Sequence, residues 1–273
     1  MQIIKKLIQF PFSLLGLRII NYKGYVNYSH KQQQKMDYIV LKANTFYKDS
    51  LENRLGNLRD SEYLQYLELK YGGYETNVSA TIQPNDVVRL KEGNRTGGDR
   101  MSVFLNNYSE KYSQYLKSLR HSNKLITILE VGILKGTGLA VWDEYFDNKI
   151  VYGFDYDLGN FEQNQNKLIE LGAFQKNLPT LKFFDQFADN SKTLEETFGT
   201  QKIDVIIDDA YHSDESIINT FNELQPYLNE SFVYFIEDNR TAWIKLQKSY
   251  PQYNFDYNDN KLTVVTKIGG SQY

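Results

Sequence analysis

The fold is decided by the segment Ile128-Leu-Glu-Val-Gly-Ile-Leu-Lys-Gly-Thr-Gly138, which is followed by Val151-Tyr-Gly-Phe-Asp155. An apolar strand leads into a glycine-rich turn, and a second short apolar strand ends in the carboxylate of Asp155. The acid follows the turn by about 20 residues, as in a βαβ unit that binds a nucleotide-type cofactor. Glycines let the backbone approach such a ligand, and the acid accepts hydrogen bonds from a ribose. We therefore expect Gly132, Gly136 and Asp155 to line a cofactor pocket.

Two features of this turn favour S-adenosylmethionine over a dinucleotide. The spacing Gly132-x-x-x-Gly136-x-Gly138 departs from the G-x-G-x-x-G of dinucleotide-binding proteins. Glu130 lies just before the turn, where its negative charge would oppose a pyrophosphate. S-adenosylmethionine has positive sulfonium and amino groups and no phosphate, so it tolerates this acid. We expect S-adenosylmethionine as the cofactor and Glu130 among the residues that bind it.

Length and composition limit the class of protein. The chain has 273 residues, enough for one sizeable α/β domain with an appendage. Its net charge of −3 argues against a general nucleic-acid-binding protein. The absence of cysteine excludes disulfides and thiolate metal sites, and it is compatible with the reducing cytoplasm, where we expect the protein to reside.

The first 20 residues form an apolar, basic arm with Lys5, Lys6 and Arg18. These charges and Pro11 interrupt the apolar run, so it falls short of a membrane-spanning helix. Two interpretations stay open. The arm lies peripherally on the cytoplasmic face of the inner membrane, or it packs on the protein's own body or on a second subunit of a homo-oligomer. We divide the chain into an arm, a helical N-terminal extension and a sheet domain, at residues 1–35, 36–95 and 96–273.

From residue 124 onward, strand patterns alternate with helix patterns. Such repeated βα units predict an α/β fold, a Rossmann-like parallel sheet with helices on both faces. Two final alternating strands joined by Asn258-Asp-Asn260 predict an antiparallel hairpin at the C-terminus. The expected strands are 125–131, 150–154, 181–184, 203–207, 232–236, 253–257 and 261–267. The expected helices of this domain are 137–146, 160–171, 191–198, 213–228 and 241–249, preceded by helical segments within 36–75 and 103–120.

Acidic residues follow five of the expected parallel strands, at the edge where ligands bind in such sheets. They are Glu130, Asp155 with Asp157, Asp185, Asp208 with Asp209, and Glu237 with Asp238. Crowded carboxylates repel one another, so we expect a cation among them, either the cofactor's sulfonium or a divalent metal. Oxygen ligands without cysteine favour Mg²⁺ over Zn²⁺.

The candidate metal ligands are Asp208, Asp209, Asp238 and Asn239, and we also expect Asp185 and Asp208 to bind the cofactor. The alternative for Asp185, Asp208 and Asp209 is to cap the helices that follow them. His212 follows the aspartate pair and is the best general base for methyl transfer to a hydroxyl, because a neutral imidazole accepts a proton near pH 7. Asp209 would orient this imidazole or the acceptor hydroxyl.

Several motifs together resemble one family. They are Gly98-Asp-Arg100, Asn107-Tyr108, Leu129-Glu-Val-Gly-Ile-Leu-Lys-Gly136, Trp142-x-x-Tyr-Phe146, Tyr152-Gly-Phe-Asp155, Asp204-Val-Ile-Ile-Asp-Asp-Ala-Tyr-His212 and Ile236-Glu-Asp238. This series is similar to class I S-adenosylmethionine-dependent O-methyltransferases of the macrocin and mycinamicin type, and to the related cephalosporin-hydroxylase-like proteins. The resemblance implies a sheet with a C-terminal antiparallel hairpin, a divalent metal, usually Mg²⁺, that holds a sugar diol, His212 as base and Asp209 beside the metal.

Catechol-type O-methyltransferases offer a second match, which implies Asp208, Asp238 and Asn239 as metal ligands. The two analogies disagree on whether Asp208 or Asp209 ligates the metal. The chain departs from the sugar enzymes at Tyr211, where they have a small residue, and at Asn107, where histidine is common.

We expect a metal-dependent methyltransferase that acts on a sugar hydroxyl of a bacterial surface polysaccharide or a natural product, with a small-molecule or glycan acceptor and no nucleic acid. The alternatives are a methyltransferase on a non-sugar small molecule and a catalytically silent methyltransferase-like binding module.

Overall fold

The computed structural model describes residues 46–72, 100–103, 106–257 and 261–269 of the chain. The N-terminal arm 1–35 and much of the extension 36–95 lie outside the described residues, so the two interpretations of residues 1–20 remain predictions. In the described part of the chain, no helix has the length and apolar character needed to cross a bilayer.

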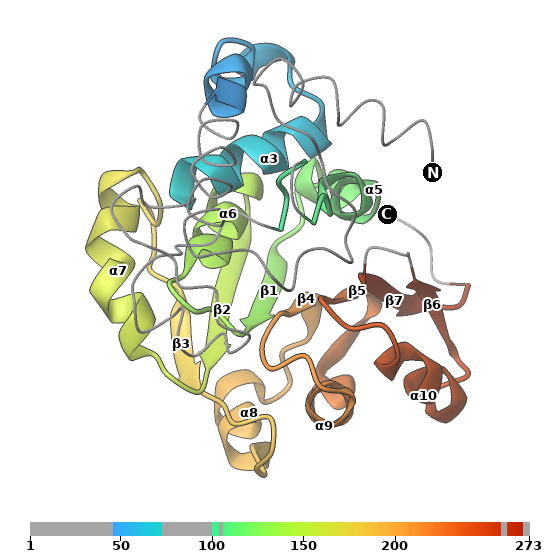
Figure 1. Cartoon of the computed structure of the whole chain (residues 1–273). Coiled ribbons are helices and arrows are strands. Elements are labelled where there is room, and N and C mark those ends of the chain that lie inside the picture. Colours follow the sequence, from blue (N-terminus) through green and yellow to red (C-terminus); the bar gives the residue numbers. More distant parts are fainter. Residues whose placement is uncertain (1–45, 73–99, 104–105, 258–260, 270–273) are drawn as a thin grey trace, which may run out of the picture.

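The sheet has seven strands in the order β3-β2-β1-β4-β5-β7-β6 (Figure 1). Strands β1 to β5 pair in parallel, whereas β7 runs antiparallel to both β5 and β6. This arrangement confirms the predicted class I methyltransferase sheet with its C-terminal hairpin. The strands are β1 (Ile126–Val131), β2 (Lys149–Asp155), β3 (Thr180–Phe183), β4 (Ile203–Asp208), β5 (Leu228–Ile236), β6 (Tyr253–Tyr257) and β7 (Thr263–Lys267).

Strand β1 is the point at which the strand order reverses, because it pairs with β2 on one side and with β4 on the other. In open parallel sheets a ligand crevice forms at this switch point, beyond the carboxyl ends of the strands. The described chain therefore brings the ends of β1, β2, β4 and β5 to one edge.

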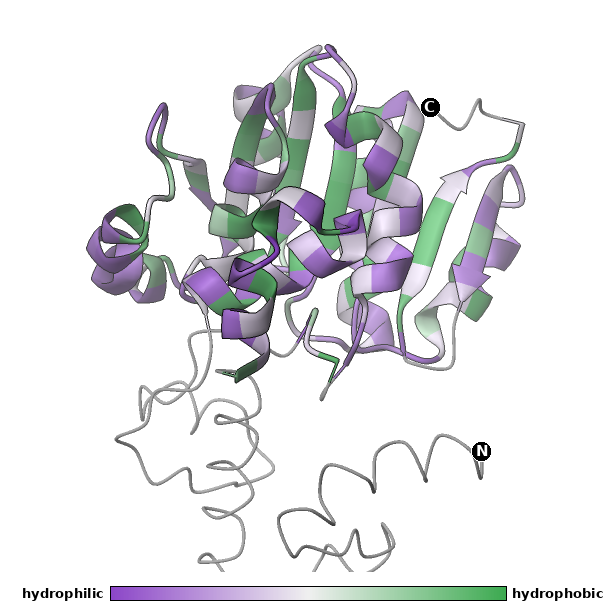
Figure 2. Cartoon of the chain, turned by 90° about the horizontal axis from the view of Figure 1, so that it is seen from above, coloured by the Kyte–Doolittle hydropathy of each residue, from purple (hydrophilic) through white to green (hydrophobic). Residues whose placement is uncertain are grey.

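Helices cover both faces of the sheet (Figure 1). One layer holds α3 (Asp60–Tyr71), α5 (Ser109–Arg120), α6 (Thr137–Tyr145) and α7 (Gly159–Glu170). The other layer holds α8 (Ser191–Phe198), α9 (Asp214–Leu224) and α10 (Ala242–Ser249). Alternate strand residues feed two separate apolar cores: Val205 and Ile207 of β4 face the first layer, and Ile206 faces the second. Figure 2 shows that the strands are largely hydrophobic, whereas the helices beside them carry many hydrophilic residues.

Two element boundaries differ from the sequence prediction. The helix expected over 213–228 is shorter, because α9 ends at Leu224 and a 3-10 turn, Gln225–Tyr227, follows. Pro226 lies in this turn and has no N–H to continue an α-helix. Similarly, the helix expected from residue 103 begins only at Ser109, because residues 100–102 are folded into the site instead.

The described part of the N-terminal extension packs directly on the sheet domain. Leu64 and Leu67 of α3 are fully buried in the same apolar core as α5 and α6. Polar contacts also join these helices, since Lys70 pairs with Glu144 and Arg120 pairs with Asp60. Helix α3 is therefore part of the layer that covers the sheet.

Candidate active site

The glycine-rich turn after β1 fits closely against the end of β4. Gly132 has a φ of 88°, and a Cβ at this position would lie 2.4 Å from the backbone oxygen of Asp209. Gly136, with a φ of 78°, starts α6 beside the ring of Phe161. Both positions need glycine, because an added side chain would be strained and would clash.

Asp155 lies at the end of β2 and is fixed by the same turn. The Leu134 N–H donates to its Oδ2 over 3.0 Å, and the Asp157 N–H donates to its Oδ1 over 2.9 Å. Burial raises the pKa of the Asp155 carboxyl, although these amides counteract that effect. The carboxylate is only partly enclosed, so it remains available to a ribose beside the turn.

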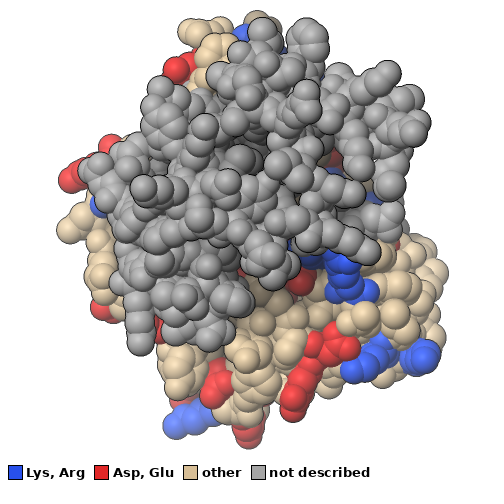
Figure 3. Space-filling view, viewed as in Figure 1, with Lys and Arg blue, Asp and Glu red and all other residues tan. Residues whose placement is uncertain are grey.

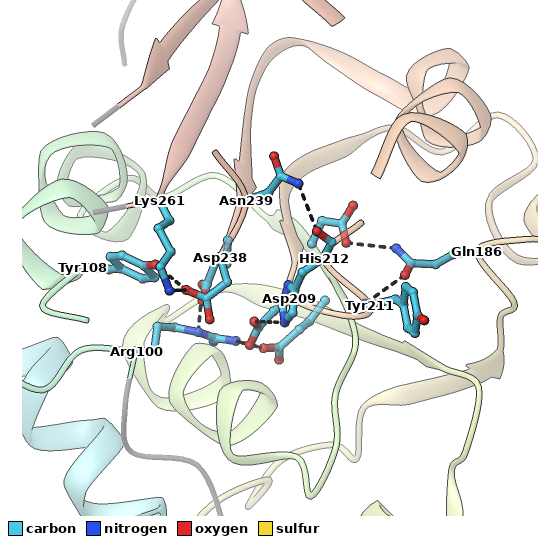
Figure 4. Close-up of polar contacts among 12 residues, drawn as sticks. Arg100, Tyr108, Gln186, Asp209, Tyr211, His212, Asp238, Asn239 and Lys261 are labelled. Carbon is cyan, nitrogen blue, oxygen red and sulfur yellow. Dashed lines mark hydrogen bonds and ion pairs between the residues drawn. The ribbon is translucent and has the colours of Figure 1, made fainter. Parts of the chain in front are cut away.

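Arg100 lies at the centre of the carboxylates at the sheet edge (Figure 4). Its Nη2 is 2.7 Å from Glu130 Oε1 and 2.7 Å from Asp209 Oδ2, and its Nε is 2.8 Å from Glu237 Oε1. The side chain is almost completely buried. The expectation of a cation among these acids is thus partly met by the protein itself, through a residue that the sequence interpretation had not assigned to the site.

One guanidinium does not balance the acids around it. Burial raises the pKa of Glu130 to about 7 and the pKa of Glu237 well above its usual range, and it also raises the pKa of Asp209. Burial disfavours the charged form of Arg100. The pKa of Arg100 is nevertheless raised well above its ordinary value by the negative charges of Glu237, Glu130 and Asp209. Further positive charge at this edge would therefore stabilise the ionised carboxylates.

Asp209, His212 and Asp238 form a group that could hold a metal ion, with one ligand atom from each lying within 4.8 Å of the others. His212 Nε2 is 3.8 Å from Asp209 Oδ1. Asp238 Oδ1 accepts a hydrogen bond of 2.8 Å from the Tyr108 hydroxyl and lies 3.7 Å from Lys261 Nζ. All three side chains of the group are partly exposed, so solvent and ligands can reach them.

The backbone around this group is strained. His212, Asp238 and Lys261 have φ values of 64°, 52° and 69°, and Asn107, just before Tyr108, has a φ of 55°. Non-glycine residues pay steric energy in this left-handed region, and such residues concentrate at functional sites. The loops after β4 and β5 are thus held in a specific shape that directs Asp209, His212 and Asp238 together.

Asp208, expected to bind metal and cofactor, lies apart from this group. Its carboxyl accepts hydrogen bonds from Gln186 Nε2 over 3.1 Å and from the Tyr234 hydroxyl over 3.3 Å. It is 1% exposed, and this burial raises its pKa to about 7. Of the two adjacent aspartates, the geometry favours Asp209 as the metal ligand. Asp208 instead lies buried at the end of β4, where it contacts Gln186 and Tyr234.

Asn239 and Asp185 also form local contacts. Asn239 Oδ1 accepts the N–H groups of Thr241 and Ala242 at the start of α10, and its Nδ2 donates to the carbonyl of His212 over 3.0 Å. Both lone pairs of Oδ1 are thus used, so we do not include Asn239 in the proposed metal site. Asp185 Oδ1 accepts the Phe187 N–H over 2.9 Å within the turn after β3.

Sequence reasoning missed four participants, which are Arg100, Tyr108, Glu237 and Lys261. The sequence interpretation includes Arg100 and Tyr108 only as parts of the family motifs, and it includes Glu237 as a strand-end acid and as part of the motif Ile236-Glu-Asp238. A signal for Arg100 was present, since an arginine before a set of strand-end acids is a natural internal counter-charge. Its partners lie far along the chain, however, and only the folded sheet brings them within contact.

The chain is similar in sequence to three curated O-methyltransferases. It is 24% identical over 178 residues to 8-demethyl-8-alpha-L-rhamnosyl tetracenomycin-C 2'-O-methyltransferase of Streptomyces olivaceus, covering 63% of this chain and 41% of the relative. It is 25% identical over 144 residues to demethylmacrocin O-methyltransferase of Streptomyces fradiae, covering 50% and 32%. It is 23% identical over 147 residues to mycinamicin VI 2''-O-methyltransferase of Micromonospora griseorubida, covering 51% and 33%.

The chain resembles macrocin-type O-methyltransferases. These matches confirm the resemblance predicted from the motifs. The chain spans about two fifths or less of the length of these curated relatives. No protein-family model matches the chain.

Among solved structures, the fold is similar to that of MycE methyltransferase from the mycinamycin biosynthetic pathway, in complex with Mg and SAH. The TM-score is 0.48 and the identity is 17%, over 66% of this chain and 53% of MycE.

Proposed function

We propose that the protein is an S-adenosylmethionine-dependent O-methyltransferase that uses a divalent metal, Mg²⁺ in particular, and methylates a sugar hydroxyl. The observation that carries the proposal is a juxtaposition at one sheet edge. The glycine turn with Asp155 lies at the ends of β1 and β2, and Asp209, His212 and Asp238 lie at the ends of β4 and β5. A methyl donor and a hydroxyl acceptor bound at these two places would meet beyond the ends of β1 and β4.

The cofactor side fits S-adenosylmethionine by charge and shape. Gly132 brings the backbone of the turn against the loop after β4, and Asp155 presents a fixed, partly exposed carboxylate to a ribose. Glu130 Oε2 is buried and has no hydrogen-bond partner in the described chain. Glu130 and Asp209 supply negative charge, which suits a sulfonium and an ammonium and disfavours a pyrophosphate.

The metal side fits a divalent cation. Asp209 and Asp238 offer carboxylate oxygens, the ligands that Mg²⁺ takes in proteins, and His212 offers an imidazole nitrogen, which suits first-row transition metals. Tyr108 donates to Asp238 and Arg100 donates to Asp209, and such outer contacts orient metal ligands. When bound, the cofactor would supply an electrophilic methyl group, and the cation would draw electron density from the acceptor oxygen.

We assign the removal of the acceptor proton to His212. Its Nε2 would take the proton from the hydroxyl while the oxygen forms its bond to the methyl carbon. Asp209 Oδ1, 3.8 Å away, would orient the imidazole and stabilise its protonated form. The Asn239 side chain holds the backbone carbonyl of His212, so the imidazole is presented from a fixed loop. If His212 itself ligates the metal, the base would be a carboxylate at the same sheet edge.

We propose a sugar as acceptor because one curated relative is named for 2'-O-methylation of a rhamnosyl compound, and the motifs resemble those of enzymes that act on sugar hydroxyls. A bacterial surface polysaccharide or a natural product is the setting that fits such an acceptor. The surface facing the viewer in Figure 3, where it is not grey, mixes acidic and basic side chains without an extended patch of one sign. That mixture agrees with a small-molecule or glycan acceptor rather than a nucleic acid.

The test is a transfer assay with methyl-labelled S-adenosylmethionine and a panel of nucleotide sugars, glycans and glycosylated natural products, with a parallel panel of catechols and other phenols. We expect label in a sugar product, in the presence of Mg²⁺ and not after EDTA treatment. Transfer confined to phenols would reject the sugar acceptor, and no transfer with any acceptor despite bound cofactor would favour a silent binding module.

A further inference from the structure

The segment that carries Arg100 is anchored by its backbone. The Tyr108 N–H donates to the Arg100 carbonyl over 2.9 Å, and the Asn107 N–H donates to the Ser102 carbonyl over 3.0 Å. The N–H between these two points, that of Met101, donates to the carboxylate of Glu68 on α3 over 2.6 Å. Met101 and Ser102 are buried, at 1% and 2% exposed, so this segment is part of the interior.

Glu68 is an unusual residue for a helix interior that packs on a sheet domain. It is 4% exposed, and its carboxylate is directed at a backbone amide from outside the helix. A hydrogen bond in the protein interior is electrostatically stronger than the same bond in water. Helix α3 is itself fixed to α5 and α6, so Glu68 transmits that fixed position to the amide that follows Arg100.

Arg100 needs such precision because it satisfies several partners at once. Its guanidinium contacts acids from the ends of β1, β4 and β5, namely Glu130, Asp209 and Glu237. The planar group has a rigid arrangement of donors, so a backbone shift at Arg100 cannot keep all three contacts. A displaced Arg100 would leave Asp209 without its 2.7 Å partner on Oδ2 and free to turn away from His212 and Asp238.

We infer that Glu68 is a positioning residue for the active site, acting through Arg100 on Asp209. The N-terminal helix α3 would then complete the metal site from outside the sheet domain, although none of its side chains belongs to the group Asp209, His212 and Asp238. The metal-site part of this inference rests on the proposed function, whereas the link from Glu68 to Arg100 does not.

The first experiment compares variants of the full chain at position 68. Glu68→Met keeps the side-chain size but removes the acceptor, whereas Glu68→Gln keeps a carbonyl oxygen for the Met101 amide. We expect Glu68→Met to weaken Mn²⁺ binding and to lower kcat, each by about 10- to 100-fold, as for other residues that orient metal ligands. Glu68→Gln should recover most of both. The Mn²⁺ affinity is measured from the electron paramagnetic resonance signal of free Mn²⁺.

The matched control is Glu62→Ala on the same helix. Glu62 accepts the backbone N–H of Arg59 at the start of α3, so its loss loosens the helix without touching the Arg100 segment. We expect Glu62→Ala to lower the thermal midpoint but to leave Mn²⁺ affinity and kcat near wild type. An equal loss of Mn²⁺ affinity in Glu62→Ala and Glu68→Met would show that Glu68 only stabilises α3, and it would overturn the inference.

A spectroscopic signal reports on Arg100 without any activity. The Arg100 guanidinium carbon lies 5.6 Å from the centre of the Trp142 ring, which is fully buried, and the chain has two tryptophans. In a Trp243→Phe background the tryptophan fluorescence therefore comes from Trp142 alone. We expect Glu68→Met to change this emission and Glu68→Gln to restore it, because a cation beside the ring perturbs its excited state.

The proposed function and the positioning role of Glu68 can fail separately. If the wild type neither binds Mn²⁺ nor transfers a methyl group, the proposed function fails, and the Trp142 emission still tests the link from Glu68 to Arg100. An unchanged Trp142 emission in a folded Glu68→Met protein would overturn the inference. If Glu68→Met does not fold, Glu68→Asp shortens the reach by one methylene and should give the same changes, and wild-type behaviour of that variant would equally contradict the inference.

Discussion

The guanidinium of Arg100 lies 2.7 Å from the carboxylate of Asp209, although the two residues are 109 positions apart in the chain. This contact joins the segment before α5 to the loop after β4 and lies beside the proposed metal site. The same guanidinium contacts Glu130 before the glycine turn and Glu237 after β5. One buried cation thus links the cofactor side and the acceptor side of the sheet edge.

Replacing Arg100 with methionine should strongly destabilise the protein. The change leaves Glu130, Asp209 and Glu237 crowded without their cation, and loss of one partner from a buried ion pair costs about 3–5 kcal/mol. Urea denaturation of both proteins at neutral pH measures the difference. Arg100→Lys keeps the charge and should retain more of the stability, so equal stability of wild type and Arg100→Met would contradict the central place given to this contact.

Gly132→Ala should disrupt the turn after β1. The residue has a φ of 88°, and the new Cβ would lie 2.4 Å from the Asp209 backbone oxygen. Backbone strain of this kind costs about 1–3 kcal/mol even before the clash is relieved. Differential scanning calorimetry should show a clear fall in the thermal midpoint. Gly56→Ala is the control, because a Cβ there meets no atom within 4 Å and should have little effect.

The metal proposal predicts that EDTA abolishes methyl transfer and that added Mg²⁺ or Mn²⁺ restores it. Asp209→Asn and Asp238→Asn should each weaken Mn²⁺ binding, because each removes a charged ligand from the group. Cofactor affinity should fall less than metal affinity in Asp238→Asn. The control is Asp189→Asn, an exposed acid at the start of α8. Full turnover by metal-free enzyme would remove the metal from the account.

His212→Ala should lower kcat by about 10²–10⁴-fold, the usual contribution of a general base, while the affinity for S-adenosylmethionine changes little. Steady-state kinetics with the identified acceptor measures this loss. His212→Gln, which keeps hydrogen-bonding ability without a comparable basicity, separates hydrogen bonding from proton removal. A near-native kcat in either variant would show that His212 only shapes the loop, and the base would then be sought at Asp209.

The sheet could be predicted from the sequence because its signals are local. Apolar runs such as 203–207 alternate with helical patterns, and the observed strands match the expected ones to within a few residues. Boundaries failed where tertiary contacts overrode the pattern. Strand β5, expected from residue 232, starts at Leu228 because Leu228 pairs with Ile203 across a register shift in the sheet.

The site could be predicted only in outline, because strand-end position does not determine where a side chain points. Asp208 and Asp209 are adjacent, yet one carboxyl contacts Gln186 and Tyr234 and the other contacts Arg100. Asn239 was expected to bind metal, but its oxygen accepts two amides at the start of α10. The roles of Arg100 and Glu68 could not be predicted, because they depend on contacts between segments that are distant in the sequence.

The cofactor is the central claim, and it can be tested without knowing the acceptor. Isothermal titration calorimetry of the full chain with S-adenosylhomocysteine should give a dissociation constant in the low micromolar range, which corresponds to a binding free energy of about −8 kcal/mol. Asp155→Ala should weaken this binding by about 1–3 kcal/mol through the lost bonds to the ribose, whereas Asp157→Ala, at an exposed residue of the same turn, should not. Tight binding of NAD with no heat from S-adenosylhomocysteine would contradict the account.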